Sequence, residues 1–171
     1  MICLVLTGKT IEENLEQFRR NRPYIDLLEL RVDLLNPEQK VKAVDFPQQV
    51  DLPVILTCRR KSDGGAYCET ERHRFSLLDE CAKGPFAYVD LEDDVKRPQF
   101  EQELNVRGVK IIRSLHDFKG IPSDIYHRVA RIAAKGEIPK MAVTPNTILD
   151  LITLFRMEQE LDSVKEKIIV G

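Results

Sequence analysis

The chain has 171 residues, of which 43% are apolar and 32% are charged, and this size and composition predict one globular domain over residues 1–171. The net charge of −2 excludes the strong positive field that attracts nucleic acids or anionic membranes. No apolar stretch approaches membrane-spanning length, and the N-terminal apolar run lacks the basic residues of a secretion signal. The four cysteines show no metal-ligand spacing, so we expect a reducing, cytoplasmic compartment and no metal site.

Short apolar runs alternate with helical patterns along the whole chain. These runs predict seven strands, at residues 2–7, 25–32, 53–58, 86–91, 108–115, 138–143 and 166–170. Alternation of strands with helices predicts an α/β domain with a parallel sheet and right-handed crossovers. Cys3 and Cys58 lie within two of the runs, and we expect both to be small core residues.

Three segments between the strands show the apolar spacing of an amphipathic helix. A capping box, Thr10-x-x-Glu13, precedes the first of them, and Thr144-Pro145 is expected to provide the N-cap and first turn of the third. The periodic residues are Ile11, Leu15 and Phe18 in the first segment, Ile125, Val129 and Ile132 in the second, and Ile148, Leu151, Ile152 and Phe155 in the third.

The predicted strands alternate apolar with polar side chains, whereas strands of an open parallel sheet are apolar on both faces. The polar positions include Glu29, Arg31, Asp33, Thr57, Arg59, Asp90, Ser114, His116 and Lys140. We expect the apolar faces to lie under the helices and the polar faces to converge inside a (β/α)8 TIM barrel. In such barrels the C-terminal mouth carries the chemistry.

Only seven strands can be counted, whereas a complete barrel typically has about 250 residues. The sequence therefore predicts a barrel truncated after its seventh strand. We expect further residues beyond Gly171 to supply an eighth strand that closes against residues 2–7.

Lys140 lies inside an apolar strand, where a charged residue needs a reason, and His116 ends the preceding strand. Burial favours the neutral amine that attacks a ketone, and a nearby imidazole can exchange protons at physiological pH. The pair therefore indicates imine chemistry with a general base. The alternatives are an edge-strand lysine that discourages aggregation and a structural histidine.

Five motifs in order resemble those of the type I 3-dehydroquinate dehydratases, the Schiff-base class of the shikimate pathway. They are Glu29-Leu30-Arg31-Val32-Asp33, Thr57-Cys58-Arg59 with Asp63-Gly64-Gly65, Tyr88-Val89-Asp90-Leu91-Glu92, Ser114-Leu115-His116-Asp117-Phe118, and Lys140-Met141-Ala142-Val143. The resemblance extends over the whole chain. It implies a lyase of aromatic amino acid biosynthesis that converts 3-dehydroquinate to 3-dehydroshikimate without a metal or organic cofactor, acts on a small molecule, and forms a homodimer.

The resemblance also implies roles for individual residues. Lys140 would form an imine with the C3 ketone of the substrate, and His116 would take the C2 proton and protonate the departing C1 hydroxyl. Asp63 stands where the family usually has a glutamate that orients this histidine. Substrate hydroxyls and the carboxylate side would be bound by Glu29, Arg31 and Arg59.

Three alternatives to this assignment are open at the level of the sequence. The first is another Schiff-base barrel, such as a class I aldolase, which would keep Lys140 but not need the motif around His116. The second is a non-catalytic regulatory relative that binds quinate-like ligands. The third is that a second shikimate-pathway enzyme is fused to this one.

Overall fold

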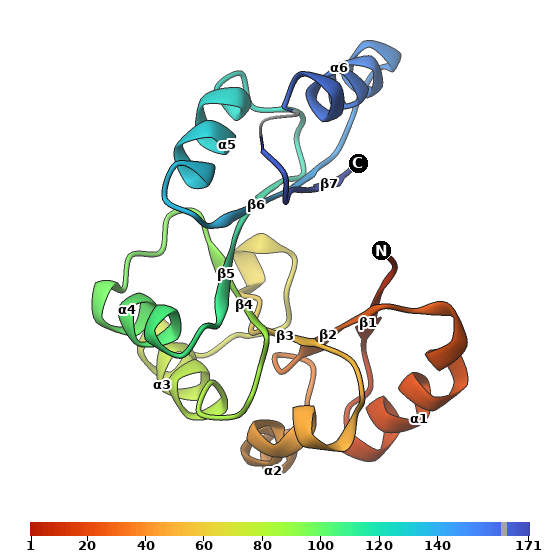
Figure 1. The fold of residues 1–171 in the computed structure, drawn as a ribbon, viewed down its shortest axis with the longest axis vertical. Coiled ribbons are helices and arrows are strands. Elements are labelled where there is room, and N and C mark those ends of the chain that lie inside the picture. The colour runs from red at the N-terminus through yellow and green to blue at the C-terminus, as the bar shows by residue number, and fades with distance from the viewer. Residues whose placement is uncertain (162–163) are drawn as a thin grey trace. The chain divides into compact units, whose positions relative to one another are not determined.

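The computed structural model describes residues 1–161 and 164–171, and within them seven strands form one sheet in chain order (Figure 1). The strands are β1 (Cys3–Leu6), β2 (Leu27–Arg31), β3 (Val54–Thr57), β4 (Tyr88–Glu92), β5 (Lys110–Asp117), β6 (Ile138–Val143) and β7 (Ile168–Val170). Parallel registers join β1 through β4, and β5 through β7. The predicted strands and their alternation with helices are confirmed, whereas closure into a barrel stays a prediction.

The connecting helices follow the strands in the order that the sequence indicates. They are α1 (Ile11–Asn21), α2 (Pro37–Lys40), α3 (Glu71–Cys81), α4 (Pro98–Val106), α5 (Ile125–Ala133) and α6 (Ile148–Glu160), with 3-10 segments η1 (Arg22–Tyr24), η2 (Val41–Gln49) and η3 (Lys61–Asp63). The chain divides into two compact units, one of Met1–Asp90 with Pro98–Val109 and one of Leu91–Arg97 with Lys110–Gly171. No helix of the described residues is long and apolar enough to cross a membrane.

In the first unit, strand alternation separates an apolar face from a polar face. Leu28, Leu30 and Val32 are fully buried, as expected for side chains that face the helices. Helix α1 buries its predicted stripe of Ile11, Leu15 and Phe18. The hydroxyl of Thr10 accepts a hydrogen bond from the Glu13 amide at 3.1 Å, which caps the helix. The Glu13 carboxylate accepts from the amide of Lys9, at 2.7 Å, so only half of the predicted capping box forms.

Helix α3 is attached to the end of β3 by a buried arginine. The Arg74 side chain is completely buried, and its Nη1 donates to the Cys58 carbonyl at 2.9 Å. Its Nε and Nη2 donate to the two carboxylate oxygens of Glu71, at 2.9 and 2.7 Å. A buried guanidinium is tolerated because its donors are satisfied. Cys58 lies in the core as predicted, but Cys3 is exposed because β1 has only β2 as a neighbour among the described strands.

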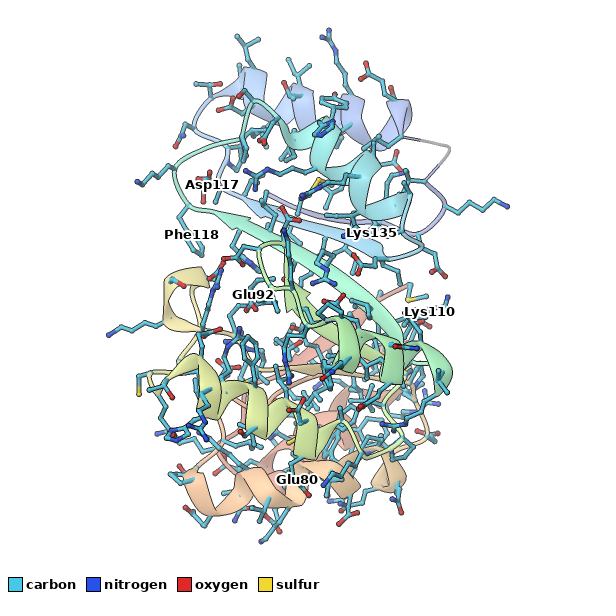
Figure 2. The ribbon with its side chains drawn as sticks, turned by 90° about the vertical axis from the view of Figure 1, so that its left-hand side faces the viewer. Glu80, Glu92, Lys110, Asp117, Phe118 and Lys135 are labelled. Atoms are coloured by element: carbon cyan, nitrogen blue, oxygen red, sulfur yellow. The ribbon has the colours of Figure 1, made fainter. Side chains whose placement is uncertain are left out.

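In the second unit, α5 and α6 cover the apolar side of β6. Met141 and Val143 of this strand pack in one cluster with Ile125 and Val129 of α5 and with Leu154 of α6. The predicted α5 stripe is therefore confirmed. Figure 2 shows Lys110 and Asp117 at opposite ends of β5, so the motif around His116 lies at the C-terminal end of that strand.

Helix α6 differs from its prediction in both its start and its buried face. It begins at Ile148, with Thr147 as N-cap in a capping box with Asp150, whereas the sequence suggested a start at Thr144-Pro145. The box satisfies the first amide groups, so it fixes the helix start. The periodic residues are also exposed, Ile148 by 74% and Phe155 by 73%. Leu154 and Met157 are buried in place of this predicted face.

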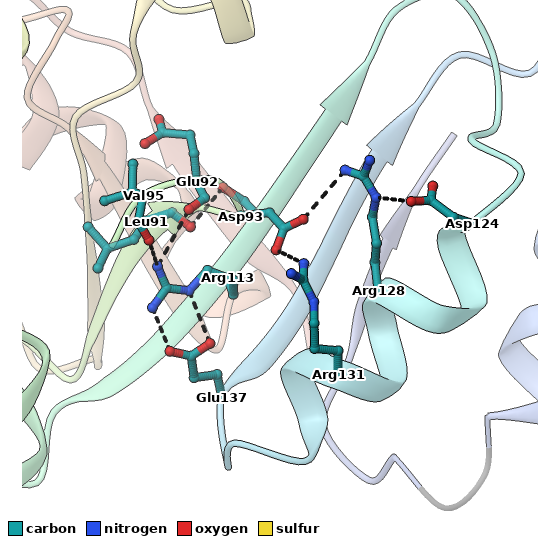
Figure 3. A network of polar contacts seen from close by, with 10 residues as sticks. Leu91, Glu92, Asp93, Val95, Arg113, Asp124, Arg128, Arg131 and Glu137 are labelled. Carbon is teal, nitrogen blue, oxygen red and sulfur yellow. Dashed lines mark hydrogen bonds and ion pairs between the residues drawn. The ribbon is translucent and has the colours of Figure 1, made fainter. Parts of the chain in front are cut away.

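Arg113 of β5 forms a buried ion pair with Glu137, which lies just before β6 (Figure 3). It also contacts Val95, in the segment that follows β4. The guanidinium of Arg113 donates to both carboxylate oxygens of Glu137, at 3.0 and 2.5 Å. Its Nη1 donates to the carbonyl of Val95 at 2.7 Å. Beside it, Asp93 accepts from Arg131 at 2.6 Å. These contacts fix the backbone that follows β4 against the second unit's own strands and helix.

The Arg113–Glu137 pair should make a measurable contribution to stability. Glu137→Ala leaves the buried guanidinium without its carboxylate, so we expect the free energy of unfolding to fall by about 3 kcal/mol. The matched control is Glu166→Ala, which removes the exposed partner of Lys110 in the same unit and should have a small effect. Denaturant unfolding of both variants measures the difference, and equal effects would contradict this account.

Candidate active site

The first unit carries the predicted substrate-binding residues on one face of its sheet. The register places Arg31 opposite Thr57, and Thr57 opposite Asp90. Aligned residues of neighbouring parallel strands point to the same face, so these three side chains share it. Glu29 belongs to this face by alternation along β2, and its side chain is buried. The structure therefore brings these polar residues together above the apolar core of the unit.

Arg59 is buried directly after β3, where it forms an ion pair with Asp90. Its Nη2 lies 2.7 Å from Asp90 Oδ2, and both side chains are at most 4% exposed. Charge-assisted hydrogen bonds of this kind are short and fix the orientation of the guanidinium. Asp90 thus holds the arginine that the sequence predicted to bind substrate. The signal for Asp90 in the sequence was its place on the polar side of β4.

Arg31 pairs with Asp33, two residues further along the chain. Its Nε and Nη2 donate to the two carboxylate oxygens of Asp33 at 2.8 and 2.6 Å. Burial alone would raise the pKa of Asp33. The hydrogen bonds from Arg31 and from the amides of Ala66 and Arg59 outweigh burial and hold this pKa below its ordinary value.

Asp63 lies in the short helix η3, in the loop that follows Arg59. Its carboxylate accepts from Arg60 Nε and from Ser62 Oγ, the latter at 2.8 Å. The two glycines that follow have separate tasks. Gly64 has a φ of 76°, which ends η3 in the left-handed region. Gly65 lies so close to the backbone of Arg59 that a Cβ atom would be 2.1 Å from its carbonyl oxygen.

The second unit carries the predicted lysine and histidine on one face of its strands. Lys140 of β6 is opposite Ser114 of β5, and His116 is opposite Ala142. By the same register argument, all four side chains share a face. Strand β6 pairs with both β5 and β7, so Lys140 does not lie on an edge strand. The anti-aggregation interpretation of Lys140 is therefore wrong.

The end of β4 adds a carboxylate to this face. The amide of Asp93 donates to the carbonyl of Ser114 at 2.8 Å, and Ser114 Oγ donates to the carbonyl of Leu91 at 3.4 Å. In a parallel pair of strands, these contacts to the residues before and after Glu92 align Glu92 with Ser114. Glu92, Ser114 and Lys140 thus form one row across three strands, and Glu92 is 1% exposed. Sequence reasoning assigned Glu92 no role, although its alternation with Asp90 was visible.

Comparison with known proteins gives consistent results over nearly the whole chain. Residues 2–171 match the family model for type I 3-dehydroquinase. The 3-dehydroquinate dehydratase of Klebsiella pneumoniae is 30% identical over 168 residues, which cover 90% of this chain and 67% of that protein.

Two solved structures share the fold. The 3-dehydroquinate dehydratase from Geobacillus kaustophilus has a TM-score of 0.83 at 22% identity, and the match covers 98% of this chain and 72% of that chain. Dehydroquinate dehydratase and shikimate dehydrogenase from S. pombe AroM has a TM-score of 0.76 at 21% identity, with 98% of this chain and 36% of that chain covered. Because the family model matches residues 2–171 and a dehydratase relative is 30% identical, the chain belongs to the type I 3-dehydroquinase family.

Proposed function

We propose that the chain dehydrates 3-dehydroquinate to 3-dehydroshikimate through an imine between Lys140 and the C3 ketone of the substrate. The observation that carries the proposal is the position of Lys140. It lies on a strand paired on both sides, and it shares its polar face with His116 in a protein of a dehydratase family. Lys140 is half-buried on this strand, and a lysine amine is the nucleophile that forms an imine with a ketone.

The proposed chemistry follows from these two side chains. The Lys140 amine adds to the ketone and expels water, and the protonated imine then withdraws electrons from C2. His116 takes the C2 proton, and the C2–H electrons form the new double bond as the C1 hydroxyl leaves. The imidazolium returns its proton to that hydroxyl, which departs as water. Hydrolysis of the imine releases the product and restores the amine.

The polar face of the first unit would bind and orient the substrate in this proposal. Arg31 and Arg59 are suited to its carboxylate and hydroxyls, because a guanidinium donates two parallel hydrogen bonds. Glu29 would accept from a substrate hydroxyl, and Asp63 would orient His116.

The alternatives differ in how far the comparisons support them. Family membership favours dehydration over aldol chemistry. A regulatory relative would bind 3-dehydroquinate without turnover, so an assay of the full-length protein separates it from an enzyme. Homodimer formation and fusion to a second shikimate-pathway enzyme stay proposals. The S. pombe protein, which combines a dehydratase with a dehydrogenase, supports the idea of fusion.

Borohydride reduction tests the imine directly. Treatment of the full-length protein with 3-dehydroquinate and borohydride should attach the ligand to Lys140, because reduction converts the imine into a stable secondary amine. Peptide mass mapping locates the adduct. Lys135→Ala, which changes an exposed lysine shortly before β6, should label as wild type does, whereas Lys140→Ala should not label. An adduct on another lysine would exclude the proposed nucleophile.

His116→Ala tests the proton acceptor. We expect kcat to fall by about 10²–10⁴-fold, the usual contribution of a positioned acid–base group, while borohydride still traps some adduct on Lys140. His127→Ala on the exposed side of α5 is the matched control and should turn over normally. Steady-state kinetics measures both variants, and a kcat close to wild type in His116→Ala would remove this residue from the mechanism.

A further inference from the structure

We propose that Asp33 is a positioning residue that fixes both substrate-binding arginines, a proposal that rests on the function proposed above. Its carboxylate is completely buried and lies directly after β2. Two of its contacts orient the guanidinium of Arg31, and two hold the backbone of the loop that begins at Arg59. Asp33 belongs to the motif that opens with Glu29, but sequence reasoning gave it no role.

The four hydrogen bonds are divided evenly between the two carboxylate oxygens. Oδ1 accepts from Arg31 Nε at 2.8 Å and from the Arg59 amide at 3.1 Å. Oδ2 accepts from Arg31 Nη2 at 2.6 Å and from the Ala66 amide at 3.0 Å. Each oxygen therefore bonds both to the Arg31 side chain, at the end of β2, and to a backbone amide of the loop that follows β3.

The loop held by Asp33 is closed on itself, so its residues are fixed together. The amide of Tyr67 donates to the carbonyl of Arg59 at 3.2 Å, and the amide of Gly65 donates to the carbonyl of Arg60 at 3.0 Å. Asp63 lies within this closed segment, at the end of η3. A shift at the base of the loop would therefore move Arg59 and Asp63 as well as Arg31.

Charge makes the carboxylate necessary at this position. The hydrogen bonds from Arg31 to Asp33 raise the pKa of Arg31, whereas the nearby positive charge of Arg59 opposes that rise. Asp33 and Asp90 thus neutralise two neighbouring guanidinium groups, the partly exposed Arg31 and the buried Arg59. An asparagine has nearly the same shape, but in either orientation its amide nitrogen would face two of the four donors. Asp33→Asn should therefore loosen both contacts while preserving volume.

The pH dependence of stability gives one readout. Because folding lowers the pKa of Asp33, its stabilising contribution is complete above the unfolded value of about 3.9 and is lost as the pH falls through the folded pKa. The difference in unfolding free energy between wild type and Asp33→Asn should be constant near neutral pH and should shrink below about pH 4. A difference that does not depend on pH would show that the charge is irrelevant.

Kinetics and amide exchange on the full-length protein test the proposal. Asp33→Asn should lower kcat/KM for 3-dehydroquinate by about 10–100-fold and raise KM, because small displacements of binding groups are costly. The amides of Arg59 and Ala66 should exchange faster. Asp51→Asn is the matched control, since Asp51 also binds an arginine, Arg22, through both oxygens but is 67% exposed. It should behave as wild type in both measurements.

If Asp33→Asn folds poorly, Gly65→Ala provides a second test, because it keeps the Asp33 carboxylate but forces the loop away from the Arg59 backbone. It should cause a similar loss of kcat/KM and faster exchange of the Ala66 amide. Unchanged kcat/KM in folded Asp33→Asn would overturn the proposal, even if exchange were faster, because Asp33 would then be structural only. Unchanged exchange at Arg59 and Ala66 would overturn it as well. If the wild-type protein does not turn over 3-dehydroquinate, the proposed function is wrong. The amide exchange rates of Arg59 and Ala66 would still show whether Asp33 positions the loop.

Discussion

Compensation of buried positive charge is the constraint on which the polar parts of this protein depend. An unpaired guanidinium is costly to bury, and a carboxylate that also accepts hydrogen bonds removes much of that cost. Arg31 pairs with Asp33 and Arg59 with Asp90 on the polar side of the first unit. In the second unit, Arg113 pairs with Glu137. These pairs determine where strand ends and loops can lie.

The same pairing gives the candidate site its geometry. A guanidinium held by two parallel hydrogen bonds has little rotational freedom, so it offers its remaining donors in a fixed direction. A preorganised binding group loses less entropy when a ligand arrives. The two glycines of the loop serve this arrangement, because Gly64 permits the turn and Gly65 permits the close approach to Arg59.

The lysine and histidine depend on a different feature, the register of parallel strands. A shift of one residue would turn every side chain of a strand to the opposite face. Lys140 and His116 share a face because β5 and β6 align Ser114 with Lys140. The apolar contacts of Met141 and Val143 with α5 and α6 keep that register, because the other register would bury the lysine among the helices.

The sequence by itself determined the seven strands, their polar alternation and the family, since these depend on local periodicity and on short motifs. Tertiary structure decided which charges pair, because Arg59 follows β3 whereas Asp90 lies on β4, and only folding brings these two side chains to 2.7 Å. It also decided the buried face of α6, where the apolar spacing of Ile148 and Phe155 fits a helix but does not reveal which side is covered. Contacts between distant residues settle these choices, and a local pattern does not contain them.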